Sequence, residues 1–147
     1  MDRGLAVVLT AAVGGLVALQ APVNSGLGRV VGTFQGALVS FLVGTALLVV
    51  LASVADGGLG QVAEARHVAW YYLVGGALGV AYVCTVLVTV RSLGAGGVTA
   101  ATIAGQLTMA LVVDQLGILG VAKNPVTAGR LLGVVLLAGG VYLIVRD

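Results

Sequence analysis

Long apolar stretches alternate with short polar connections along the whole chain. Five stretches are long enough to cross a bilayer as helices, which takes roughly 20 mostly apolar residues against a hydrocarbon core of about 30 Å. They lie at about residues 5–23, 30–55, 68–90, 98–116 and 128–145. Because the apolar runs are continuous, they do not fit the alternating strands of a membrane β-barrel. The pattern predicts an all-α integral membrane protein whose residues 1–147 form a single domain of five transmembrane helices.

The composition excludes most other classes of protein. Hydrophobic residues make up 60% of the chain and charged residues 8%, whereas soluble domains have about 45–50% and about 25%. The net charge of +2 comes from scattered residues, so no basic patch suits a nucleic acid. The single cysteine, Cys84, excludes an internal disulfide and a multi-cysteine metal site. With no nucleophile–base pair or metal-ligand cluster in the sequence, we expect no enzyme activity, metal, cofactor or nucleic-acid partner.

The first apolar stretch follows a positive residue, Arg3, as in a secretory signal peptide. However, Ala18 to Ala21 (ALQA) is a poor small-x-small cleavage site. We therefore expect this stretch to be kept as a transmembrane helix.

Positive residues are divided almost equally between the two sides of the membrane. Five spans would place four Lys and Arg residues on the side of the N-terminus, called side A, and three on the opposite side, called side B. Side A holds Arg3, Arg66, Lys123 and Arg130, and side B holds Arg29, Arg91 and Arg146. Orientation normally follows a clear excess of Lys and Arg in cytoplasmic loops. Either folding or a partner fixes one orientation, or copies insert both ways and pair antiparallel. The antiparallel pair is favoured because transporters commonly join two inverted halves around a midplane site.

The end of the first stretch contains a cluster of polar residues around a proline. Pro22 has no backbone N–H for the carbonyl of Ala18, so the helix is predicted to kink or end there. Uncompensated polar groups in hydrocarbon usually face a partner or a cavity. The cluster is therefore either a capped helix end at the interface or a broken helix lining a polar site. Its side chains are Gln20, Asn24, Ser25 and Arg29.

Other polar residues lie inside the third and fourth stretches. Thr102 and Gln106 share one face of the fourth stretch. The Gln106 amide either forms a hydrogen bond with a neighbouring helix or lines a cavity. Tyr82 lies in the middle of the third stretch. Asp114 is the only carboxylate inside a stretch, and it is expected to reach the interface, to pair with Lys123 or Arg130, or to meet an arginine of an inverted partner.

Small residues recur at four-residue spacing, which lets helices approach closely in lipid. In the second stretch they form a stripe, and the third stretch has a single pair. We predict close helix packing at Gly32, Gly36, Ser40 and Gly44, and at Gly75 and Gly79.

Several segments together resemble one known family. They are QAPVNSGLGR at 20–29, SFLVGT at 40–45, GGALGVAY at 75–82, the pair Gly105 and Gln106, and DQLG at 114–117. In this order they resemble the short YdcZ-type branch of the drug/metabolite transporter superfamily. The resemblance implies a five-helix protein of the bacterial inner membrane, related to half of a ten-helix transporter. It also implies antiparallel dimers, paired or fused genes, and export of poorly defined solutes. By position, its signature polar residues would be Gln20, Asn24, Gln106 and Asp114.

The chain departs from the related four-helix multidrug proteins, which rely on a glutamate embedded in their first helix. No acidic residue lies between Arg3 and Asn24. This argues against proton-coupled export of lipophilic cations. Arg29 and the amides suit a neutral or anionic polar solute better.

The leading functional hypothesis is an exporter of small polar solutes that works by alternating access as a dual-topology homodimer in the lipid bilayer. Amide and hydroxyl side chains would bind the solute, Arg29 and Asp114 would form a gate or an inter-subunit ion pair, and Pro22 would permit rocking. The solute-binding residues would be Gln20, Asn24, Ser25, Tyr82, Thr102 and Gln106. Two alternatives stay open, a passive dual-topology channel and the structural half of a heterodimeric transporter.

Overall fold

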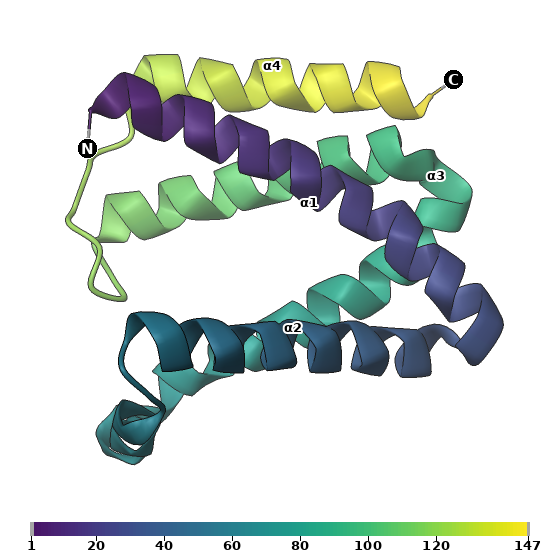
Figure 1. The fold of residues 1–147 in the computed structure, drawn as a ribbon. Helices are drawn as coiled ribbons and strands as arrows, with labels where there is room; N and C mark the ends of the chain where they lie inside the picture. Colours follow the sequence, from purple (N-terminus) through teal and green to yellow (C-terminus); the bar gives the residue numbers. More distant parts are fainter. Residues whose placement is uncertain (1, 147) are drawn as a thin grey trace. The chain divides into compact units, whose positions relative to one another are not determined.

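The computed structural model describes residues 2–146, which are helical apart from short connections. Met1 and Asp147, the two ends of the predicted domain, lie outside the described residues. Figure 1 shows the four α-helices, and a short 3₁₀ helix, η1, lies between α2 and α3. In chain order the elements are α1 (Arg3–Val31), α2 (Thr33–Ala55), η1 (Gly60–His67), α3 (Trp70–Leu116) and α4 (Ala128–Val145).

All four α-helices are long and apolar enough to cross a membrane. At 47 residues, α3 is long enough for two crossings, and its backbone is non-helical at Gly94, with φ 67° and ψ 172°. This break divides α3 into residues 70–93 and 95–116, each of which reaches the roughly 20 residues that one crossing takes. The structure thus agrees with the predicted class, an all-helical membrane protein, and residues 5–23, 98–116 and 128–145 each fall within one helix. The predicted stretch at 30–55 instead runs from the end of α1 through Gly32 into α2, and the stretch at 68–90 begins two residues before α3.

Two predicted connections are wrong. Residues 24–29 continue α1 to Val31, so the first helix neither ends near Val23 nor breaks at Pro22. Residues 91–97 belong to α3 apart from the break at Gly94. Polar and glycine-rich segments keep helical hydrogen bonds here because a bilayer offers the backbone no water as an alternative partner. Pro22 removes only one of those bonds.

Gly32 links α1 to α2 rather than packing within a helix, which corrects the first member of the predicted stripe. Its backbone has φ 94° and ψ 151°, a conformation that favours glycine. The Gly32 N–H donates to the Gly28 carbonyl over 3.0 Å, and the Gly32 carbonyl accepts from the Gly36 N–H over 2.8 Å. One residue therefore ends one helix and begins the next.

The chain forms two compact units, one that ends at Arg91 and one that starts at Ser92. In the first unit, the buried core is made by Ala37 of α2 with Val83 and Leu87 of α3. Of the large side chains in the described residues, Leu87 alone is fully buried. Most large apolar side chains are exposed, for example Leu16 at 67%, Leu48 at 66% and Leu136 at 67%. Such a surface requires lipid or another apolar protein surface around it.

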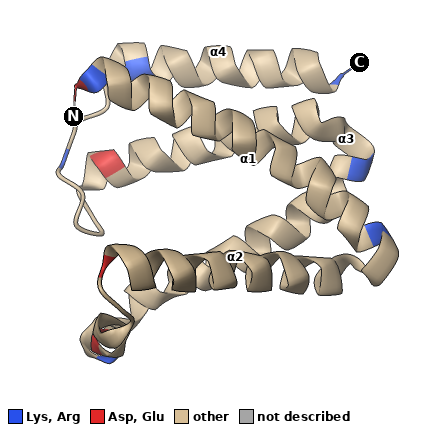
Figure 2. Ribbon diagram, in the orientation of Figure 1, with Lys and Arg blue, Asp and Glu red and all other residues tan. Residues whose placement is uncertain are grey.

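Charged residues lie near helix ends, in connections or near the Gly94 break, and the middles of the spans carry none (Figure 2). This distribution is typical of helices that cross a hydrocarbon layer, where a charge is costly. The polar residues that remain inside the spans are therefore uncharged amides and hydroxyls.

Candidate functional site

The second half of α1 presents one buried face to the rest of the first unit. Its members are Ala21, Asn24, Ser25 and Gly28, at spacings of three and four residues. Such residues lie one above another on a single face of a helix. Asn24 and Ser25 are 6% and 4% exposed, and they are the buried polar residues of the described chain. Two polar side chains thus lie at a packed helix face inside a membrane-length helix.

The contact between α1 and α2 is backbone against backbone at two glycines. A methyl group on Gly36 would lie 2.9 Å from the Gly28 Cα and 3.0 Å from the Gly28 nitrogen. A methyl group on Gly28 would lie 3.3 Å from Cδ2 of Leu87. Gly36 therefore lies at a close helix approach, and its partner is Gly28, which the sequence pattern did not single out.

The other small residues of the predicted stripes have looser surroundings. A methyl group on Gly79 would lie 3.5 Å from Phe41, which is ordinary contact. Within residues 2–146, nothing lies within 4 Å of the corresponding position on Gly44 or Gly75. Gly44 and Ser40 instead line a groove.

That groove brings α1 and α2 residues together beside the core of the first unit. It has a volume of about 240 Å³. Its polar lining comes from Gln20 of α1 and from Ser40 and Thr45 of α2, and its apolar lining includes Phe41, Leu48 and Val83. Thr45 was missed by sequence reasoning, although it directly follows Gly44 of the stripe. The groove is large enough for a small solute and offers it an amide and two hydroxyls.

Tyr82 of α3 is half-buried and packs against the core of Ala37, Val83 and Leu87. The hydroxyls of the nearby threonines donate hydrogen bonds to backbone carbonyls of the same helix. Thr85 Oγ1 donates to the Ala81 carbonyl over 2.8 Å, and Thr89 Oγ1 donates to the Thr85 carbonyl over 3.0 Å.

Arg91, rather than Arg29, is the cation next to the buried face of α1. A methyl group on Gly28 would lie 3.7 Å from Arg91 Nη2. Arg29 follows Gly28 in the helix and is exposed, about 100° around the axis from the buried face. Sequence reasoning missed Arg91 as a site residue, since spacing along the chain does not show which arginine folds over α1.

In the second unit, Thr102 and Gln106 lie one helical turn apart on α3. Thr102 is half-buried and Gln106 is exposed. No described residue of its own unit forms a hydrogen bond with the Gln106 amide, and the same holds for Gln20 in the first unit. Both amides therefore lie in apolar helices with their hydrogen-bonding capacity unused.

Asp114 pairs with Arg130 of the same chain, which is one of the alternatives that the sequence left open. Arg130 Nη1 lies 3.1 Å from Asp114 Oδ2, and the two side chains are 35% and 30% exposed. The Asp114 carbonyl also accepts from the Asn124 N–H over 2.8 Å. Asp114 thus anchors the α3–α4 connection and the start of α4 to the end of α3.

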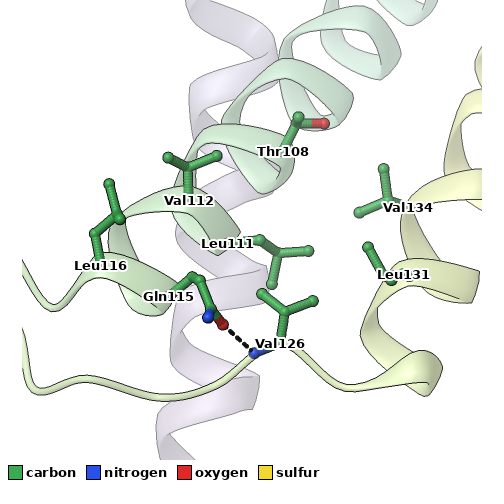
Figure 3. Close-up of a pocket in the computed structure, with 8 residues that line it drawn as sticks. All are labelled: Thr108, Leu111, Val112, Gln115, Leu116, Val126, Leu131 and Val134. Atoms are coloured by element: carbon green, nitrogen blue, oxygen red, sulfur yellow. Dashed lines mark hydrogen bonds between the residues drawn. The ribbon is translucent and has the colours of Figure 1, made fainter.

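A second hollow, of about 300 Å³, lies between the end of α3 and the start of α4 (Figure 3). Its lining is apolar except for Thr108 and Gln115. The Gln115 Oε1 atom accepts from the Val126 N–H over 2.8 Å, and Thr108 donates to the Ala104 carbonyl. Because the lining is otherwise apolar and both the Thr108 hydroxyl and the Gln115 Oε1 atom are already bonded, this hollow suits an apolar group better than a polar solute.

Comparison with family models matches residues 5–143 to the family described as "Putative inner membrane exporter, YdcZ". No curated protein and no solved structure matches the chain. The match covers nearly the whole chain, in agreement with the resemblance carried by the segments at 20–29, 40–45, 75–82, 105–106 and 114–117. The chain is therefore a multi-pass inner membrane protein that belongs to the YdcZ family.

Proposed function

We propose that the protein exports small polar solutes as an antiparallel homodimer that works by alternating access. The family supplies the coarse activity, export across the inner membrane. The solute class, the dimer and the mechanism are inferred from the polar residues of the spans and from the charge distribution.

The unpartnered amides carry this proposal. Gln20 and Gln106 are exposed on apolar helices, and neither side chain forms a hydrogen bond with a described residue of its own unit. A side-chain amide has two donors and an acceptor with two lone pairs. Lipid tails satisfy none of these, so each amide needs a protein partner or a water-filled cavity. A chamber that admits a polar solute meets this need.

The exposed apolar surface and the balanced charges favour an inverted second copy. With four positive residues on one side and three on the other, the Lys and Arg excess is too small to set the orientation of the chain in the membrane. Two copies inserted oppositely reproduce the inverted repeats of many transporters, whose binding sites lie at the repeat interface near the midplane. The groove of Gln20, Ser40 and Thr45 would then be present twice, once from each side.

Each site residue has a role in this proposal. Gln20, Asn24, Ser25, Thr102 and Gln106 bind solute through amides and hydroxyls, and Tyr82 forms an apolar wall. Gly32 and Gly94, at which the helices are interrupted, absorb the dihedral changes of rocking. Asp114 anchors α4 through Arg130 instead of gating.

The test is solute flux into liposomes with a panel of metabolites, comparing wild type with Gln106→Ala and Gln20→Ala. Each change removes hydrogen bonds worth about 1 kcal/mol apiece, so losing one or two should lower apparent affinity about tenfold. Gln61→Ala is the matched control, because Gln61 lies in η1 outside the spans and should leave flux unchanged. Saturable flux that falls only in the span variants supports a carrier. Ionic current at channel rates, or flux indifferent to both span variants, contradicts it.

A further inference from the structure

Arg91 is a cation without a counter-charge at the end of the first unit. In the described chain, neither an ion pair nor a hydrogen bond involves its side chain. No acidic residue lies near it in sequence, since the acidic residues of the first unit are Asp2, Asp56 and Glu64, at the other helix ends. An arginine in or beside hydrocarbon normally pairs with an anion, a carbonyl or water.

The guanidinium lies over the buried face of α1. Arg91 Nη2 is 3.7 Å from where a side chain on Gly28 would begin, so the guanidinium lies within van der Waals reach of this face of α1. Ser25 and Asn24 precede Gly28 by three and four residues on the same face. Because each residue rises about 1.5 Å, they lie about one turn along the helix from Gly28.

Ser25 supplies a second, independent observation. Its hydroxyl is buried and has no hydrogen-bond partner within residues 2–146. Buried hydroxyls are nearly always bonded, so an unpaired one calls for a partner such as an ion or a water molecule. Asn24, which directly precedes Ser25, is also buried and adds a side-chain amide with two N–H donors.

We infer that Arg91, Ser25 and Asn24 form a binding position for the anionic oxygen group of the transported solute, a carboxylate or a phosphate. The inference rests on the proposed transport function and narrows its substrate class from polar solutes to organic anions. Arginine presents a planar fork of N–H donors that matches both groups in a bidentate manner. The serine hydroxyl and the asparagine amide donate the remaining hydrogen bonds. No carboxylate of the first unit lies there to repel the anion.

Binding to the purified full-length protein in an uncharged, phospholipid-free detergent tests the inference. The probes are radiolabelled inorganic phosphate and radiolabelled benzoate, with benzamide as a competitor that differs from benzoate mainly in charge. We expect saturable binding of at least one anion and at least tenfold weaker competition by benzamide. Arg91→Gln should weaken anion binding about tenfold or more, because it removes a charge-assisted contact. Ser25→Ala should weaken it about threefold to tenfold.

Arg66→Gln is the matched control, since it removes one positive charge from the exposed η1 connection. A purely structural role for Ser25 is excluded separately, because Ser25→Ala removes a hydroxyl without a partner and should not lower the thermal unfolding midpoint. The inference is overturned if wild type binds neither anion, if Arg91→Gln binds like wild type, or if Arg66→Gln loses as much. It is also overturned if phosphatidylglycerol occupies the position and soluble anions do not, because the oxyanion would then come from a lipid headgroup.

This outcome is distinguishable from failure of the transport proposal. Saturable flux lost in Gln106→Ala, together with anion binding indifferent to Arg91, would defeat only the anion position. Anion binding that depends on Arg91, without flux of any solute, would defeat only the transporter.

Discussion

Gly36→Leu is expected to prevent the chain from reaching a stable fold. Even a single methyl group on Gly36 would lie 2.9 Å from the Gly28 Cα and 3.0 Å from its nitrogen. Both neighbours are backbone atoms of a helix that Gly32 ties directly to α2, so neither helix yields without breaking the link. Overpacking by a few methylenes costs about 1–3 kcal/mol even where side chains can move. With total stabilities of about 5–15 kcal/mol, a larger clash against backbone should remove most of the folded population.

The measurements are the monodisperse yield by size-exclusion chromatography and the thermal unfolding midpoint in detergent. The yield should fall several-fold. Gly75→Leu is the control, because within the described chain a side chain on Gly75 meets nothing within 4 Å. It should retain yield and midpoint. Equal losses in both variants, or none in Gly36→Leu, would show that the Gly28–Gly36 contact does not support the fold.

Adding two lysines to the η1 connection should force a single orientation and abolish activity of the homodimer. Gln61→Lys with Val62→Lys changes the balance from four against three to six against three in favour of side A. An excess of this size in a short loop normally directs that loop to the cytoplasm. If transport requires one copy in each orientation, uniform insertion removes the antiparallel dimer. Solute flux in intact cells should then fall to that of cells without the protein.

Rescue distinguishes loss of orientation from damage. Ser92→Lys with Ala95→Lys, combined with Arg66→Gln and Lys123→Gln, changes the balance to two against five in favour of side B. The added lysines lie at exposed positions beside the Gly94 break. Each charged variant alone should be inactive, and co-expression of the two should restore flux. Gln61→Ser with Val62→Ser controls for the change of side chain. Full activity of the η1 lysine variant with uniform orientation would mean that a parallel or monomeric chain transports.

The sequence was sufficient for the all-helical class and for the apolar nature of the long helices, because the length and hydrophobicity of a segment are the main signals of a membrane-spanning helix. It was insufficient for the helix ends. Residues 24–29 and 91–97 have the polar and glycine-rich composition of loops, yet they stay helical because the membrane protects their backbone hydrogen bonds. In residues 3–55 and 70–116, the helices are interrupted at Gly32 and Gly94, where the backbone has positive φ.

The candidate site was predictable in its residue types and not in its partners. The polar cluster of Gln20, Asn24 and Ser25 could be recognised because amides and hydroxyls are costly in apolar helices. Which arginine accompanies it depends on how α3 folds over α1, and the structure selects Arg91 over Arg29. The partner of Asp114 depended in the same way on the path of the α3–α4 connection, which brings Arg130 to it.

The most direct test of an antiparallel dimer is the orientation of the wild-type chain in intact cells. Cys84→Ala removes the native thiol, and Gln61→Cys places a single thiol in the exposed η1 connection. A membrane-impermeant maleimide is applied to intact cells, and then to cells with permeabilised membranes. Dual insertion predicts that about half of the chains react from outside and the rest only after permeabilisation. Reaction of nearly all chains from one side alone would contradict the antiparallel homodimer.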